Sequence, residues 1–350
     1  MADARAVAST HPQGLVDLSV GTPVDPVPPV VQRALADAAD APGYPTTHGT
    51  ALLRGAAVDW MTRRLDVSGI DADAVLPAIG TKELVASLPM LLGLGAGSRV
   101  MVPELAYPTY DIGAQVVGAD VVASDSTMAI GPGRIDLVWL NSPANPTGRV
   151  LPVEHLRKVV TWARERGAIV VSDECYIELG WDARPVSVLH PDVCGSTHDG
   201  VLALHSLSKR SNLAGYRAGF AAGDPALVGE LLQARKHLGL MMPAPVQAAM
   251  TAALDDDAHV VEQRNRYSAR RQVLMAALGE AGFTIEHSEA GLYLWVTRGQ
   301  SCMATVDWFA ERGILVAPGD FYGARGADHV RVALTASDER VEAGATRIAG

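Results

Sequence analysis

Short apolar runs recur between residues 51 and 223, and stretches with helical spacing of apolar side chains separate them. The runs are Arg99–Val102, Ala119–Val122, Leu137–Leu140, Ala168–Val171 and Val201–Leu204. Runs of this length are typical of buried strands, and intervening helices, such as the one expected over 153–165, turn each connection into a crossover. The pattern therefore predicts a large α/β domain with a mostly parallel sheet covered on both faces.

The length of the chain predicts a second domain. A chain of 350 residues exceeds what one ordinary core accommodates, since domains commonly contain about 100–200 residues. We place the large domain at residues 41–240, and we expect residues 1–40 and 241–350 to form a smaller α+β domain. The elements predicted for the smaller domain are a helix near 258–280 and strands near 291–297 and 329–334.

The composition argues against several classes of function. A hydrophobic content of 48% with 19% charged residues is typical of a compact chain rather than a disordered one. The formal net charge of −10, with no cluster of lysine and arginine, argues against nucleic-acid and acidic-membrane partners. No apolar run reaches the roughly 20 residues that cross a bilayer, and the first residues lack a cationic start, so we expect a cytoplasmic protein.

The cysteines and histidines do not form metal-binding patterns. Cys175, Cys194 and Cys302 lie far apart without a C-x-x-C spacing, so we expect free thiols. The ten histidines include no H-x-x-x-H or H-x-H pair. We therefore expect no metal site.

The segment from Ser206 to Gly219 contains the strongest candidate for a nucleophile. Lys209 lies just beyond an apolar run, and Arg217 follows eight residues later. A lysine that forms an imine must lose its proton, and burial or nearby positive charge lowers its pKa to allow this. Ser206, Ser208 and Arg217 offer hydroxyl groups and a guanidinium fork to an anion such as a phosphate. Taken alone, the pattern also fits a surface lysine beside a loop.

Two further clusters follow predicted strands, at the ends where open α/β sheets bind ligands. Asp173 and Tyr176 come directly after the run at 168–171, and a buried carboxylate such as Asp173 can keep a ring nitrogen protonated. Asn145 lies after the run at 137–140 and carries an amide donor suited to a phenolate oxygen. Each also has a simpler interpretation, because Asp173 can cap the next turn and Asn145 can belong to an ordinary proline-containing turn.

Taken together, the motifs resemble those of the class I and II aminotransferases of pyridoxal-5′-phosphate fold type I. They are Asn145-Pro146-Thr147-Gly148, Asp173-Glu174-Cys175-Tyr176, Ser206-Leu207-Ser208-Lys209 and Gly215-Tyr216-Arg217-Ala218-Gly219. The resemblance covers nearly the entire chain and implies pyridoxal 5′-phosphate as the cofactor. It also implies that Lys209 forms the Schiff base with this cofactor and moves protons during amino transfer.

The same resemblance implies roles in cofactor binding. Asp173 would pair with the pyridine nitrogen, while Asn145 and Tyr176 would donate hydrogen bonds to the 3′ oxygen. Tyr107 would stack on the pyridine ring, although a packed core aromatic is the alternative. The side chains that would hold the phosphate are Thr81 and Lys82 at the Gly-led start of a helix, with Ser206, Ser208 and Arg217.

Three further positions match the family's substrate and partner contacts. Arg331, in the strand predicted at 329–334, would bind the substrate α-carboxylate through a bidentate pair. The backbone at Gly21 would lie against the substrate. Tyr44 would reach into the active site of a partner subunit, so the resemblance implies a homodimer with shared sites and small amino-acid and 2-oxo-acid substrates.

Within the family, the chain is most similar to the actinobacterial succinyldiaminopimelate aminotransferases. The segments that carry this similarity are 21–26, 211–217 and 313–323. They imply amino transfer between N-succinyl-LL-2,6-diaminopimelate and 2-oxoglutarate in lysine and diaminopimelate biosynthesis. Two alternatives share the fold and the lysine: an aminotransferase for another amino acid, and a pyridoxal-phosphate-dependent β-lyase of cysteine conjugates. The effector-binding half of a transcription regulator would need a basic DNA-binding module, for which this sequence offers no candidate.

Overall fold

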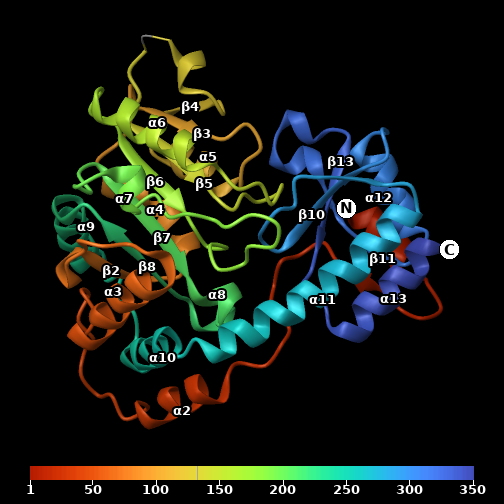
Figure 1. Ribbon diagram of the computed structural model, residues 1–350, viewed down its shortest axis with the longest axis horizontal. Helices are drawn as coiled ribbons and strands as arrows, with labels where there is room; N and C mark the ends of the chain where they lie inside the picture. Colours follow the sequence, from red (N-terminus) through yellow and green to blue (C-terminus); the bar gives the residue numbers. More distant parts are fainter. Residues whose placement is uncertain (132) are drawn as a thin grey trace.

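A seven-stranded sheet forms the centre of the larger lobe in the computed structural model, which describes residues 1–131 and 133–350 (Figure 1). The strands are β2 (Val75–Ile79), β3 (Arg99–Val102), β4 (Asp120–Ala123), β5 (Leu137–Asn141), β6 (Ile169–Asp173), β7 (Val201–Ser206) and β8 (Ala218–Gly223), in the order β2-β8-β7-β6-β5-β3-β4. The pairs between β4 and β7 are parallel, whereas β8 runs antiparallel to both of its neighbours. The predicted mostly parallel α/β sheet is confirmed.

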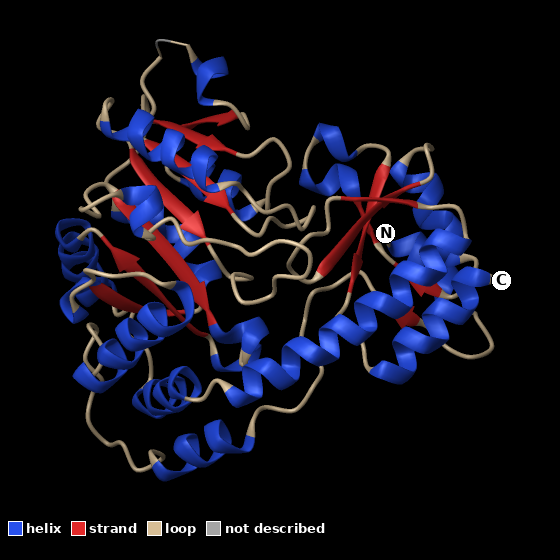
Figure 2. Cartoon of the chain, viewed as in Figure 1, coloured by secondary structure: helices blue, strands red, loops and turns tan. Residues whose placement is uncertain are grey.

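Helices cover both faces of this sheet (Figure 2). They are α3 (Ala51–Leu65), α4 (Thr81–Leu91), α5 (Thr109–Val116), α6 (Val153–Arg164), α7 (Pro191–Cys194), α9 (Pro225–Leu238) and α10 (Ala244–Asp255). Strand β5 shows why both faces are apolar, because successive side chains point to opposite sides. Leu137 and Trp139 pack in the cluster with α4, α5 and α9, while Val138 and Leu140 pack in the cluster with α3, α6 and α10.

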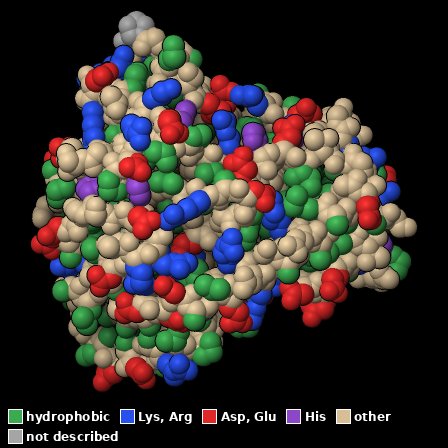
Figure 3. All heavy atoms as spheres, viewed as in Figure 1, with side chains coloured by type: hydrophobic (Ala, Val, Ile, Leu, Met, Phe, Trp, Pro, Cys, Tyr) green, Lys and Arg blue, Asp and Glu red, His purple; other side chains and the backbone are tan. Residues whose placement is uncertain are grey.

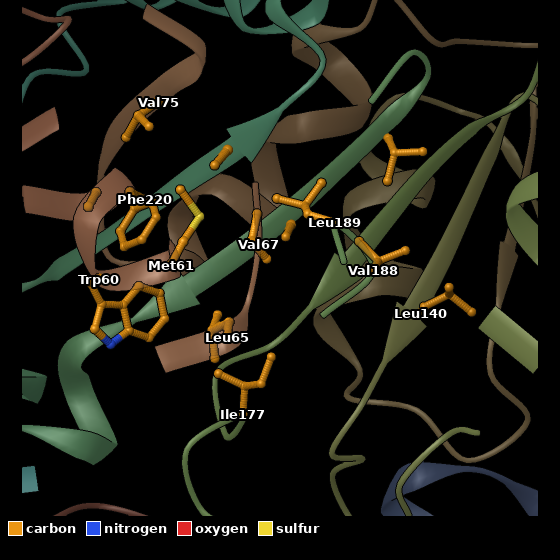
Figure 4. Packing of buried hydrophobic residues seen from close by; sticks show 14 of the residues in the cluster. Trp60, Met61, Leu65, Val67, Val75, Leu140, Ile177, Val188, Leu189 and Phe220 are labelled. Atoms are coloured by element: carbon orange, nitrogen blue, oxygen red, sulfur yellow. The ribbon is translucent and has the colours of Figure 1, made fainter. Parts of the chain in front are cut away.

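Packing between two aromatic side chains joins α3 to the sheet. The rings of Trp60 on α3 and Phe220 on β8 meet edge to face, with their centroids 5.9 Å apart, inside the cluster drawn in Figure 4. Both side chains are buried, and burying a side chain of this size contributes about 1.5–3 kcal/mol to stability. This packing holds α3 against β8.

The smaller lobe contains a second sheet and both ends of the chain (Figure 1). Its strands are β9 (Thr284–Glu286), β10 (Tyr293–Thr297), β12 (Ala317–Pro318) and β13 (His329–Ala333), in the antiparallel order β12-β13-β10-β9. A separate parallel pair joins β1 (Val16–Asp17) to β11 (Ile314–Leu315). The helices here are α1 (Ala2–Ser9), α11 (Ala258–Glu280), α12 (Cys302–Ala310) and α13 (Asp338–Ala349). The long helix α11 runs from beneath the larger lobe into the smaller one.

The packing of two helices differs from the predicted division at residues 40 and 240. Helix α2 (Pro29–Asp37) and helix α10 pack on each other, and α10 also packs on α3. The buried residues Val31, Ala249 and Met250 belong to the same hydrophobic cluster as the larger sheet. The core of the larger lobe therefore includes both helices, and the chain leaves it where α11 begins.

The described residues show neither a membrane span nor a metal cluster. No helix among them is long and apolar enough to cross a membrane. Within the same residues, no group of three or more His, Cys, Asp or Glu side chains could hold a metal ion. Acidic and basic side chains are interspersed over the face shown in Figure 3.

Candidate active site

A cavity of about 390 Å³ lies where the carboxyl ends of β5, β6 and β7 approach β10 and β13. Every site residue predicted from the sequence lines it, with the exception of Tyr44. These residues are Gly21, Thr81, Lys82, Tyr107, Asn145, Asp173, Tyr176, Ser206, Ser208, Lys209, Arg217 and Arg331. Side chains separated by up to several hundred positions in the sequence therefore share one chamber.

Lys209 lies on the single-turn helix α8 (Leu207–Arg210), directly after β7. The hydroxyl of Ser206 accepts a hydrogen bond from the backbone N–H of Ser208 at 3.1 Å, which caps this turn. The Nζ of Lys209 donates to the carbonyl of Gly21, across the cavity from the sheet. The amine is thus held between the larger sheet and the N-terminal segment.

Burial lowers the pKa of Lys209 below its ordinary value. The positive charges of Arg331 and Arg217 act in the same direction, whereas Tyr293 and Cys175 oppose them. A lowered pKa favours the unprotonated amine, which is the form that attacks a carbonyl carbon. The surroundings of Lys209 therefore suit an imine-forming role.

Asp173 is the last residue of β6 and is buried. Its Oδ2 accepts a hydrogen bond from the hydroxyl of Tyr110 at 2.8 Å, and its Oδ1 accepts one from the backbone N–H of Cys175 at 3.2 Å. Burial raises the pKa of Asp173, and the hydrogen bonds from Cys175 and Tyr110 oppose this rise. A buried carboxylate so held is suited to pair with a protonated ring nitrogen.

Asn145 is fixed by its neighbours in the loop after β5. Its backbone N–H donates to Oδ1 of Asn141 at 2.8 Å, and the Nδ2 of Asn141 donates to the carbonyl of Asp173 at 2.8 Å. The Oδ1 of Asn145 accepts a hydrogen bond from Nη1 of Arg331 at 2.8 Å. Its amide nitrogen is therefore the group it can offer to a ligand oxygen.

Arg331 lies in the middle of β13 and is buried. Its Nη2 donates to the carbonyl of Ser19 at 2.7 Å, and its guanidinium carbon lies 3.9 Å from the centre of the Tyr293 ring. Its buried Nε has no hydrogen-bond partner among the described residues. A planar cation held in this way is suited to bind a carboxylate.

Two tyrosines, Tyr176 and Tyr293, lie beside Arg331 in the cavity. The hydroxyls of Tyr176 and Tyr293 lie 3.2 Å apart, and burial raises the pKa of Tyr176 well above its ordinary value, so this phenol stays protonated. The backbone of Gly21 lies so near that an added Cβ would stand 2.0 Å from the Tyr293 hydroxyl. Position 21 therefore requires glycine for the chain to pass this close.

The start of α4 forms the other end of the cavity. Gly80 precedes this helix with a φ of 75°, and an added Cβ there would lie 2.2 Å from Nη2 of Arg217. No side chain caps the helix, so its first N–H groups, with Arg217 and Ser208 beside them, can bind an anion. The Oγ1 of Thr81, the first helical residue, instead lies 3.2 Å from the Sγ of Cys175.

Tyr107, predicted to stack on the cofactor ring, lies near the exposed Lys82. The Nζ of Lys82 lies 5.9 Å from the centre of the Tyr107 ring, and that ring meets Tyr110 edge to face. The buried carboxylate, the buried amine and the anion site at α4 are the three features that pyridoxal 5′-phosphate requires for its ring nitrogen, its aldehyde and its phosphate. The residues present therefore fit this cofactor.

Tyr44 lies apart from the cavity in the single chain. Its side chain is 97% exposed. Among the described residues, no other large hydrophobic or aromatic side chain is as exposed. A predicted contact with a partner subunit is compatible with this exposure. Its role stays a prediction.

Several residues that line the cavity were not predicted as site residues. Tyr110 lies in the first turn of α5, three positions after Tyr107, which precedes the helix. Tyr293 reaches Arg331 because β10 and β13 pair, which puts the two residues diagonally across the same face of the sheet. Only the strand register reveals that contact. The other lining residues that were not predicted are Val20, Thr22, Val85, Asn141, Cys175 and Ala214.

Comparison with known proteins gives consistent results along the chain. The family model described as "Aminotransferase class I and II" matches residues 13–348. The chain is 63% identical over 99% of its length to a probable aminotransferase of Mycobacterium tuberculosis, of which the match covers 83%. It is 60% identical over 97% of its length to the 4-dedimethylamino-4-oxo-anhydrotetracycline transaminase OxyQ of Streptomyces rimosus, of which it covers 95%. Among solved structures, a probable N-succinyldiaminopimelate aminotransferase from Thermus thermophilus superposes with a TM-score of 0.89 at 28% identity, over 99% of this chain and 98% of that one.

Proposed function

Because this chain belongs to the class I and II aminotransferases, which depend on pyridoxal 5′-phosphate, we propose that it moves an amino group from an amino acid to a 2-oxo acid in the cavity around Lys209. The observation that carries this proposal is the shared lining of that cavity. It brings a buried amine, Lys209, a buried carboxylate, Asp173, and a buried guanidinium, Arg331, into one chamber. These are the groups needed to hold the cofactor at one end and an α-amino acid at the other.

When bound, pyridoxal 5′-phosphate supplies an aldehyde that condenses with amines and a ring that accepts electrons. In our proposal, Lys209 would be the point of attachment, and its amine would move the proton between the substrate Cα and the cofactor C4′. Asp173 would keep the ring nitrogen protonated, and Asn145 and Tyr176 would donate to the 3′ oxygen. The phosphate would be held by Thr81, Lys82, Ser206, Ser208 and Arg217, and Tyr107 would stack on the ring, all of which line the cavity.

For the substrate, we propose N-succinyl-LL-2,6-diaminopimelate with 2-oxoglutarate as the acceptor. Arg331 supports an α-amino-acid substrate, since its buried fork is suited to a carboxylate next to the reacting carbon. The name of the Thermus thermophilus neighbour supports the specific compound. The product would belong to lysine and diaminopimelate synthesis.

A second candidate substrate is a ketone on a large polycyclic compound. It is favoured by the 60% identity to OxyQ, whose name describes transfer to such a ketone. Arg331 would then bind the carboxylate of the amino donor only, and the acceptor would have to enter the same cavity without that contact.

Half-reactions distinguish these possibilities. The holoenzyme is mixed with one amino donor at a time, without an acceptor, and the change in cofactor absorbance is followed. We expect conversion with N-succinyl-LL-2,6-diaminopimelate and with glutamate, and recovery of the starting spectrum on addition of 2-oxoglutarate. Conversion by glutamate with recovery only by the polycyclic ketone would select the second candidate. Release of pyruvate and ammonia from a cysteine conjugate without any acceptor would contradict amino transfer.

We also propose that two copies of the chain share their active sites through Tyr44. The exposure of this side chain supports the proposal, because a ring that is 97% exposed in the single chain is free to contact a partner subunit. Sedimentation equilibrium should give a dimer. Tyr44→Phe should weaken cofactor binding, while the mass of the assembly should remain that of a dimer. A monomeric holoenzyme with full activity would contradict the proposal.

A further inference from the structure

The N-terminal segment of residues 18–28, here called the strap, lies along the substrate side of the cavity. Val20, Gly21 and Thr22 of the strap line the chamber. Its first residues contact the smaller lobe and Lys209 through backbone carbonyls: Leu18 accepts from Ala333 N, Ser19 from Arg331 Nη2, Val20 from Thr335 Oγ1 and Gly21 from Lys209 Nζ. The strap therefore touches both the amine and the guanidinium of the site.

A buried ion pair fixes the far end of the strap. Asp25 receives two hydrogen bonds from Arg270 on α11, with Nη1 at 2.8 Å from Oδ2 and Nη2 at 2.6 Å from Oδ1. The side chains are only 9% and 3% exposed, respectively. The Nε2 of Gln263, also on α11, donates to the same carboxylate at 2.7 Å. Both carboxylate oxygens are thus held in one orientation.

The same network reaches the loop that follows Lys209. Asn212 lies three residues after the lysine, in a left-handed conformation with a φ of 55°. Its Nδ2 lies 2.9 Å from Oε1 of Gln263 and 3.2 Å from the carbonyl of Pro26 in the strap. The strap, α11 and the lysine loop are therefore joined around Asp25.

We propose that Asp25 is a positioning residue for substrate binding, and that its ion pair with Arg270 keeps the strap carbonyls of Ser19 and Gly21 against Arg331 and Lys209. The inference rests on the proposed function, in which Arg331 binds the substrate carboxylate. Because Ser19 orients the Arg331 guanidinium, a displaced strap misplaces that contact.

The contacts proposed for the ring nitrogen and the phosphate of the cofactor lie outside the strap. The hydrogen bonds that hold Asp173 come from Tyr110 and Cys175, in the larger lobe. The anion site at the start of α4 is likewise formed by residues of that lobe. Loss of the Asp25 charge should therefore weaken substrate binding and leave the cofactor in place.

Asp25→Asn in the holoenzyme tests this inference, since asparagine preserves the shape and removes the charge. We expect the KM for the amino donor to rise about tenfold or more, with kcat within about threefold and the cofactor spectrum unchanged. Hydrogen–deuterium exchange should accelerate over residues 18–28 and not in β6 or β7. Arg270→Lys, which retains the charge and loses the fork, should give a smaller rise in KM.

Asp338→Asn is the matched control, because Asp338 is the other partner of Arg270, with its Oδ1 2.6 Å from Nε, and lies outside the strap. It should leave KM and strap exchange within about twofold of the parent. Unchanged KM and exchange in Asp25→Asn, or an equal rise in Asp338→Asn, would overturn the inference. If the unaltered protein transferred no amino group to any acceptor, the proposed function would fail, while the exchange measurement would still report on the strap.

Discussion

The two halves of the cavity are formed by different parts of the chain. The floor, defined by Asn145, Asp173 and Lys209, lies at or just beyond the ends of three adjacent parallel strands. The wall, defined by Gly21 and Arg331, joins the N-terminal strap to a strand of the smaller lobe. The floor thus belongs to one sheet, whereas the wall exists only when distant segments come together.

This difference indicates how each half responds to change. In the floor, strand register places Asn141 opposite Asp173, so the spacing of the groups follows from the backbone ladder. In the wall, the hydrogen bond from Arg331 to Ser19 joins residues 312 positions apart. Contacts of this kind depend on how the lobes are arranged. Variants in the floor should therefore alter the chemical step, and variants in the wall should alter substrate affinity.

The largest effect is expected in the floor, for Lys209→Ala. Loss of both the covalent link and the proton carrier should reduce kcat by about 10⁴-fold. The visible absorbance of the bound cofactor should disappear as well. A variant that keeps the parental spectrum and kcat would contradict the assignment of Lys209 as the residue that binds the cofactor and carries the proton.

Asp173→Asn should give the next largest effect. An amide carries no charge to keep the ring nitrogen protonated, so we expect kcat to fall by about 10²-fold while KM changes little. Steady-state kinetics with a saturating cofactor measure both quantities. A rise in KM without a fall in kcat would contradict the claim that Asp173, as a floor residue, acts on the chemical step.

In the wall, Arg331→Lys should show the opposite pattern. Lysine retains the charge but cannot form a bidentate pair, so the KM for the amino acid should rise about 10–100-fold. The cofactor should stay bound, since Lys209, Asp173 and the anion site at the start of α4 are unchanged. An unaltered KM would contradict the assignment of Arg331 to the substrate carboxylate.

The smallest effect is expected for Tyr110→Phe, which tests whether the floor extends to a residue that the sequence did not suggest. Burial raises the pKa of Asp173, and the Tyr110 hydroxyl opposes this rise. Loss of that hydroxyl should raise the pKa of Asp173 further. The acidic limb of the kcat profile should then move to higher pH, because the ionised form of Asp173 is required. An unmoved limb would indicate that this hydrogen bond does not tune the carboxylate.

The same comparison explains what the sequence could predict. The floor was predictable because Asp173 and Lys209 follow continuous apolar runs, and helix α11 was predictable from its 23-residue helical pattern. Strand β8 was not predicted, since Ala218–Gly223 is rich in glycine and alanine and contains no β-branched residue. Helix α10 was likewise not predicted, and its small apolar residues do not show which core they join.

The wall was harder to predict from the residues themselves. Arg331 was identified through a resemblance, and its neighbour Tyr293 was missed because strand pairing alone brings the two together. The Asp25–Arg270 pair spans 245 positions and leaves no local pattern. Substrate specificity depends on such contacts, so the choice between the candidate substrates depends on experiment.

The most direct test of the central claim is to find which lysine carries the cofactor. The chain has four candidates, Lys82, Lys158, Lys209 and Lys236, and two of them, Lys82 and Lys209, line the cavity. Borohydride reduction of the holoenzyme, followed by peptide mass mapping, fixes the cofactor at its point of attachment. We expect a pyridoxyl group on Lys209 and none on Lys82. Attachment at Lys82, or at no lysine, would contradict it.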